Sequence, residues 1–159
     1  NILYFSQYAG RSIDVLGTQN PVNPRFVGSL EDVWQSYFQI SNGTGYFNQR
    51  SSRSVRKFSL ENPQQPQLNE GLYNYSENIY LVAIKPVNEH IYCAYYNRET
   101  ENYGLLILSS DFENNNEPIF LETGSGRPTD IAVFESDENV ILHIYPLVLT
   151  ELTLLMLPI

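Results

Sequence analysis

Cysteine is nearly absent from this sequence, which limits the crosslinks and sites that the chain can form. The 159 residues include a single cysteine, Cys93, so neither an internal disulfide nor a cysteine-based zinc site can be built. Its neighbours from Ile91 to Tyr95 are apolar or aromatic, as is typical of a small buried side chain in a strand. We therefore expect Cys93 to lie in the core.

Basic residues are also few. Nine Lys and Arg stand against 18 Asp and Glu, which gives a formal net charge of −9. A surface of this sign repels the phosphates of nucleic acids and of anionic lipids, so we expect no nucleic-acid partner. The chain has a single basic run, Arg50, Arg53, Arg56 and Lys57, which is interspersed with serines and is most simply a solvated turn and strand edge.

Long apolar runs are missing. No run reaches the roughly 18 residues that a membrane-spanning helix needs, and the apolar stretch 147–159 is short and is interrupted by Thr150, Glu151 and Thr153. We expect no membrane span. The chain starts at Asn1, directly before a strand-like run and with no signal-peptide pattern, so we treat both ends as potential cuts from a longer polypeptide.

Helical periodicity is missing too, whereas a strand-and-turn pattern repeats. A strand-like segment followed by Asn-Pro-x-x-Pro occurs at 11–24 and at 54–66, and a third copy at 104–118 keeps only its last proline. Asparagine bonds its own backbone and proline fixes φ, so each motif predicts a turn followed by a new strand. The closing prolines lie 42 and 52 residues apart: Pro24, Pro66 and Pro118.

Each repeat holds about four predicted strands. Cutting after the last strand of each repeat divides one repeat domain, 1–159, into the pieces 2–16, 25–60, 67–109 and 119–158. Strands such as 79–84 are apolar throughout, which requires cover on both faces. We therefore expect an all-β chain with about fourteen strands in four-stranded antiparallel blades, a fragment of a larger β-propeller. An ordinary β-sandwich is the alternative fold.

The order of apolar strand, Asn-Pro-x-x-Pro, short strand and glycine resembles the LVIVD repeats of bacterial and eukaryotic surface propellers. The closest match is the run 11–16, followed by 20–24 and by Phe26 to Gly28. The third copy departs from the pattern, because Asp111 and Phe112 are inserted before its one proline. The resemblance implies a propeller of about six to eight blades. It implies no catalytic residues.

Candidate catalytic and metal-binding residues are sparse. His90 and His143 fall in different repeats, and no nucleophile elbow, phosphate loop or dinucleotide fingerprint occurs. We therefore expect no enzyme site and no cofactor in this segment. One segment is rich in the oxygen ligands that calcium prefers, but it lacks the glycine and the spacing of a calcium loop, so a solvated turn is the simpler interpretation; its residues are Asp111, Glu113, Asn115 and Glu117.

Two sequons and a group of tyrosines suggest a role at the surface. The sequons Asn42-Gly43-Thr44 and Asn74-Tyr75-Ser76 fall at expected turns, so we predict glycans at Asn42 and Asn74. The tyrosines either contact sugars or proteins or fill space between blades; they are Tyr73, Tyr75, Tyr80, Tyr92, Tyr95, Tyr96 and Tyr103.

These patterns favour a non-enzymatic binding or scaffold module at the cell surface or outside the cell, with protein or carbohydrate partners. One alternative is a structural subunit that self-associates into a larger assembly, for example a glycosylated filament. A second alternative is a propeller enzyme whose site lies outside this segment.

Overall fold

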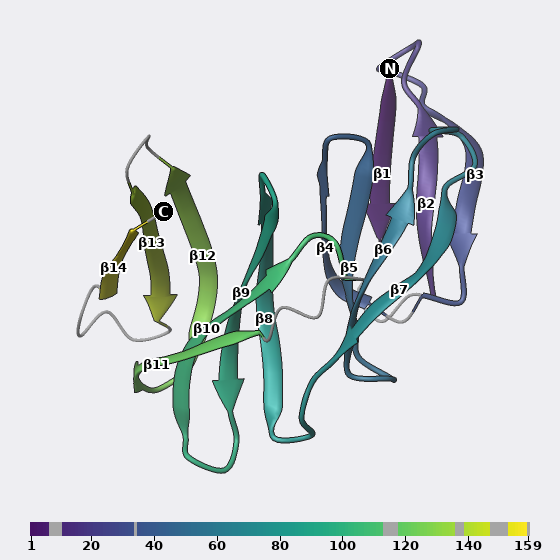
Figure 1. Cartoon of the computed structure of the whole chain (residues 1–159). Helices are drawn as coiled ribbons and strands as arrows, with labels where there is room; N and C mark the ends of the chain where they lie inside the picture. Colours follow the sequence, from purple (N-terminus) through teal and green to yellow (C-terminus); the bar gives the residue numbers. More distant parts are fainter. Residues whose placement is uncertain (7–10, 34, 113–117, 136–138, 147–152, 159) are drawn as a thin grey trace. The chain divides into compact units, whose positions relative to one another are not determined.

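The computed structural model describes residues 1–6, 11–33, 35–112, 118–135, 139–146 and 153–158 (Figure 1). These residues form fourteen strands and no helix, and all the strand pairs are antiparallel. The prediction of an all-β chain with antiparallel sheets is confirmed. No helix in this described part of the chain is long and apolar enough to span a membrane.

The chain divides into two compact units. The first unit, Asn1–Asn74, holds a three-stranded sheet in the order β1-β2-β3 and a four-stranded sheet in the order β4-β5-β6-β7. Its strands are β1 (Ile2–Ser6), β2 (Ser12–Gly17), β3 (Arg25–Glu31), β4 (Gln35–Ser41), β5 (Thr44–Gln49), β6 (Ser54–Ser59) and β7 (Gln67–Asn74).

The second unit, Tyr75–Ile159, repeats the plan in reverse order. A four-stranded sheet, β11-β10-β9-β8, precedes a three-stranded sheet, β12-β13-β14. The strands are β8 (Ile79–Val87), β9 (His90–Asn97), β10 (Asn102–Ser109), β11 (Ile119–Ser125), β12 (Pro128–Glu135), β13 (Asn139–Pro146) and β14 (Thr153–Pro158).

The sheets begin one strand later than the pieces 2–16, 25–60, 67–109 and 119–158, which corrects the expected division. The strand after each Asn-Pro turn pairs back with the strand before it, so β3 pairs with β2 and β7 pairs with β6. The expected pieces placed that strand in the next sheet. Consecutive strands joined by a tight reversal lie side by side, so their pairing places both in one sheet.

The Asn-Pro turns form as their sequence predicts. Asn20 accepts a bond at Oδ1 from the Val22 N–H, 3.1 Å, and a bond at its carbonyl from the Asn23 N–H, 3.1 Å. Asn62 repeats both bonds, with the Gln64 N–H at 3.2 Å and the Gln65 N–H at 2.9 Å. The corresponding turn of the third copy includes residues 113–117, which lie outside the described residues.

The same backbone hydrogen bond occurs at the end of the β1–β2, β5–β6 and β9–β10 hairpins, so equivalent residues of these three sheets can be matched. The N–H groups of Thr18, Leu60 and Ser110 donate to the carbonyls of Asn1, Gly43 and Glu89, at 2.9, 3.0 and 2.8 Å. These bonds place β1, β5 and β9 at the same position in their sheets. β5 and β9 each have a neighbour on both sides, but β1 pairs only with β2 among the described residues.

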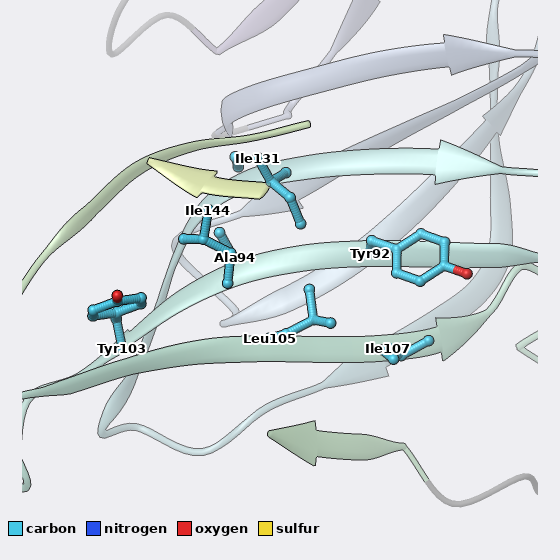
Figure 2. Packing of buried hydrophobic residues seen from close by; sticks show 8 residues of the cluster. Tyr92, Ala94, Tyr103, Leu105, Ile107, Ile131 and Ile144 are labelled. Carbon is cyan, nitrogen blue, oxygen red and sulfur yellow. The ribbon is translucent and has the colours of Figure 1, made fainter. Parts of the chain in front are cut away.

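Each unit has its own core between its two sheets. In the first unit, Ile13, Leu30 and Val33 pack with Phe47, Phe58 and Leu60. In the second, Ile131 of β12 and Ile144 of β13 pack on residues of the preceding sheet (Figure 2), namely Ala83, Tyr92, Ala94, Tyr103, Leu105 and Ile107. Burying such side chains contributes about 1.5–3 kcal/mol each, which accounts for the pairing of the sheets.

The expectation for Cys93 is confirmed. This residue lies on β9, fully buried, and burial raises the pKa of its thiol far above the ordinary value. A thiol that stays protonated is a poor nucleophile, so Cys93 acts as a core residue.

The face of the first sheet that points away from the second sheet is uncovered. Leu3, Phe5 and Phe26 are 51%, 44% and 64% exposed on this face. The recurring backbone bond makes Phe5 equivalent to Phe47 of β5 and Cys93 of β9, and both of these are fully buried. The uncovered face therefore carries an apolar side chain, Phe5, at a position that is buried in the β4–β7 and β8–β11 sheets.

Candidate binding site

The two sequon asparagines lie at opposite ends of the β4–β7 sheet, and both are exposed. Asn42 occupies the turn between β4 and β5, where its φ of 49° and the φ of 75° at Gly43 form the two-residue turn that suits a hairpin. Asn74 is the last residue of β7 and lies opposite Ser54. Each asparagine is therefore accessible to modification.

The other candidate residues do not come together in one site. His90 is exposed beside the β8–β9 turn, whereas His143 belongs to β13 of the next sheet. Asp111 is exposed and its N–H donates to Ser109 Oγ, 3.3 Å. The rest of the predicted oxygen-rich loop, Glu113, Asn115 and Glu117, lies outside the described residues. No group of three or more His, Cys, Asp or Glu in the described ranges could hold a metal ion.

Three of the seven tyrosines are buried in the second unit, namely Tyr92, Tyr95 and Tyr103. Tyr92 and Tyr103 belong to the core between its two sheets, whereas Tyr95 lies on the opposite face of β9. Tyr95 packs edge-on against Phe120, with ring centroids 5.8 Å apart, and its pKa is raised, first by burial and then by the negative charge of Glu122. The space-filling interpretation therefore fits these three residues.

Two further tyrosines each form a cation–π contact with an arginine. Tyr80 of β8 and Tyr96 of β9 are paired directly across the two strands, so their side chains share a face, and both are half-buried. The guanidinium carbon of Arg98 lies 5.0 Å from the ring centre of Tyr80, and that of Arg127 lies 5.3 Å from the ring centre of Tyr96. We refer to Tyr80, Tyr96, Arg98 and Arg127 as the Tyr–Arg cluster.

Local hydrogen bonds place Arg98 over its tyrosine. Asn97 Oδ1 accepts from the Glu99 N–H at 2.9 Å, and the Arg98 N–H donates to the Asn78 carbonyl at 2.9 Å. The amide of Asn78 also donates to Glu99 Oε2 at 2.6 Å. These bonds tie the turn after β9 to the start of β8, where Tyr80 lies.

A second loop supplies Arg127. Gly126 connects β11 to β12 with a φ of 113°, a conformation that glycine adopts without strain, and its N–H donates to the Glu101 carbonyl at 3.1 Å. This bond anchors the loop to the turn before β10. Arg127 follows directly and reaches Tyr96.

The hydrogen-bond donors of the two arginines face solvent. Arg98 and Arg127 are exposed, and within the described part of the chain no carboxylate forms an ion pair with either one. The nearby Glu99 accepts from Asn78, and Glu122 accepts from Thr100 and Asn102. A cation–π contact at such a site contributes about 0.5–1 kcal/mol, which favours one guanidinium orientation but leaves its donors open.

Neither arginine was predicted from the sequence as a site residue. Tyr96 and Arg98 are two residues apart at the end of a strand, a spacing that places them on one face and offered a signal. Arg127 gave no signal, because its contact with Tyr96 depends on the loop between β11 and β12.

No protein-family profile and no curated protein matches this sequence. The structure is similar to the crystal structure of a protein from Lactobacillus plantarum, a target of the Northeast Structural Genomics Consortium, with a TM-score of 0.61 at 12% identity. The alignment covers 98% of this chain and 51% of that one, so this chain spans about half the length of the matched protein. At this identity the similarity shows the fold alone.

Proposed function

We propose that this chain is part of a β-propeller in which further sheets continue the stack at both ends. Three observations support the proposal. The same arrangement of strands recurs in three sheets, because the backbone bonds from Thr18, Leu60 and Ser110 occupy equivalent positions in them. The edges of β1 and β14 have no partner strand among the described residues. The matched protein is about twice as long as this chain.

The resemblance to LVIVD repeats is part of the same proposal. Its support is the turn chemistry, because the turns at Asn20 and Asn62 have the same pair of hydrogen bonds. The complete propeller would place the uncovered face of the β1–β3 sheet against another blade.

We further propose that the propeller is a non-enzymatic binding module and that the Tyr–Arg cluster contacts a partner protein. The observation that carries this proposal is the pair of exposed arginines held on tyrosine rings without a carboxylate partner among the described residues. Tyrosine and arginine dominate the binding energy of many protein interfaces. Arg98 and Arg127 cover one face of each ring, which leaves less tyrosine surface for a sugar, so a protein that presents carboxylates fits better than a neutral carbohydrate.

Removing both arginines is expected to release that partner. In the full-length protein, the double change Arg98→Ala and Arg127→Ala should weaken binding at least tenfold, because a hot-spot residue contributes about 2 kcal/mol or more. Quantitative affinity capture from the native extract, followed by measurement of the dissociation constant of each captured protein, tests this. Arg25→Ala, at an exposed position on β3, is the matched control. If every captured protein binds the double variant as tightly as the wild type, the cluster is not the contact site.

A structural subunit of an assembly is the second candidate function. The uncovered residues Leu3, Phe5 and Phe26, together with the open edge of β1, favour it, because a second copy could cover this face as well as the rest of the same chain could. A mass that rises with the concentration of the full-length protein would favour this candidate over the binding module.

We also propose an extracellular or cell-surface location, and glycans at Asn42 and Asn74 test it. Enzymatic deglycosylation of the protein from its native source should lower its intact mass by the mass of two glycans. Asn42→Gln and Asn74→Gln should each reduce that loss of mass by one glycan, because Asn42 is exposed in the β4–β5 turn and Asn74 is exposed at the end of β7. Asn88→Gln, in an exposed turn without a sequon, should change nothing. A bare protein at both sites would remove the support for this location.

A further inference from the structure

Arg56 occupies a position whose equivalent in the β8–β11 sheet is apolar. On β6 it lies directly opposite Phe47 of β5, and Phe58 shares the same face. Both phenylalanines are fully buried and pack with Ile13 of the first sheet. The recurring bonds at Leu60 and Ser110 make Arg56 equivalent to Leu106, which is fully buried in β10. A cation therefore stands next to an aromatic core.

The hydrogen bonds of Arg56 are incomplete. Its Nη1 donates to Gln49 Oε1 at 3.0 Å, but its Nε is buried and has no hydrogen-bond partner. Among the described residues no carboxylate pairs with the guanidinium. A buried charged donor without an acceptor is unfavourable, so this arrangement indicates that an acceptor comes from outside the described structure.

The surroundings of Arg56 suit a polar, anionic group. The aromatic face ends at this residue, because the next row across the sheet holds Gln49, Ser54 and Asn74. Ser54 is fully buried, and its Oγ lies 2.7 Å from Ser52 Oγ. The same turn carries Arg50 and Arg53, so the positive charge is local in a chain whose formal net charge is −9.

We propose that Arg56 anchors a second binding site, which takes a carboxylate group of a ligand. The Nε–H and the adjacent Nη–H point in parallel and match the two oxygens of a carboxylate. Gln49 is a positioning residue, because its bond to Nη1 fixes the plane of the guanidinium. This site lies in the first unit and is independent of the Tyr–Arg cluster in the second unit.

Acetate is the simplest probe of this site. In the full-length protein at constant ionic strength, replacing chloride by acetate should raise the Tm of the wild type, because a ligand that binds only the folded state stabilises it. Acetamide, which has the same shape without the charge, should give no rise. Arg56→Leu should abolish the acetate effect, whereas Arg25→Leu, at an exposed position on β3 outside both sites, should retain it. An equal rise in wild type and Arg56→Leu would overturn the proposal.

The stability of the variant without acetate separates a binding role from a structural one. Leucine fills the equivalent position in β10, and it removes an incompletely bonded charge. The Tm of Arg56→Leu without acetate should therefore equal or exceed that of the wild type, and a lower Tm would show that Arg56 is a structural residue and overturn the proposal. Arg56→Lys keeps the charge but loses the paired donors, so its acetate affinity should fall about tenfold. Unchanged affinity in this variant would also contradict the proposal.

Discussion

Expressed by itself, the segment 1–159 is expected to aggregate or to form oligomers instead of a monodisperse monomer. The face of the β1–β3 sheet that carries Leu3, Phe5 and Phe26 would be open to water. The edge of β1 would also present unpaired backbone groups, which associate readily with other strands. Exposed apolar surface and an open edge on one sheet together favour self-association.

Light scattering after size-exclusion chromatography measures this outcome directly, and a urea titration reports whether the segment unfolds cooperatively. The full-length protein, at the same concentration, is the control and should elute as one species with a sharp transition. A monodisperse and cooperatively unfolding monomer of residues 1–159 would show that the segment needs no further sheets.

The strands and turns could be predicted from the sequence because their causes are local. Asn20 and Asn62 bond to the backbone two and three residues ahead, so five residues contain the whole turn signal. The apolar neighbours of Cys93 likewise predicted its burial correctly. Apolar strand-like runs and Asn-Pro turn motifs are properties that a sequence displays directly.

The grouping of strands into sheets could not be predicted in the same way. An Asn-Pro turn indicates that the chain reverses, but it does not indicate whether the next strand stays in the sheet or starts another. The pairing of β7 with β6 rests on backbone bonds along both strands, which no residue type specifies. The prediction therefore matched the number of strands among the described residues, but it placed the sheet boundaries one strand too early.

The two candidate sites escaped prediction for different reasons. Alternation along β6 places Arg56 on the same face as Phe58, so the sequence contained a signal that a charged residue borders the core. The mixture of serines and cations around it favoured a solvated turn instead. Arg127 reaches Tyr96 from the loop between β11 and β12, and a contact between residues so far apart in the sequence leaves no local pattern.

We propose that another sheet covers the outer face of β1–β3 in the complete protein, and the side chain of Phe5 would lie beneath that cover. Phe5 is 44% exposed in this chain, yet it is equivalent to Phe47, which is fully buried. In the full-length protein, Phe5→Ala should therefore lower the free energy of unfolding by about 3–5 kcal/mol, as much as Phe47→Ala.

Urea unfolding of the full-length wild type, Phe5→Ala and Phe47→Ala measures these values. Val22→Ala is the control, because this side chain is 91% exposed in a turn and should change the free energy of unfolding by no more than about 0.5 kcal/mol. Equal losses at Phe5 and Phe47 are the result that a propeller predicts. A Phe5→Ala variant as stable as Val22→Ala, beside a destabilised Phe47→Ala, would contradict it.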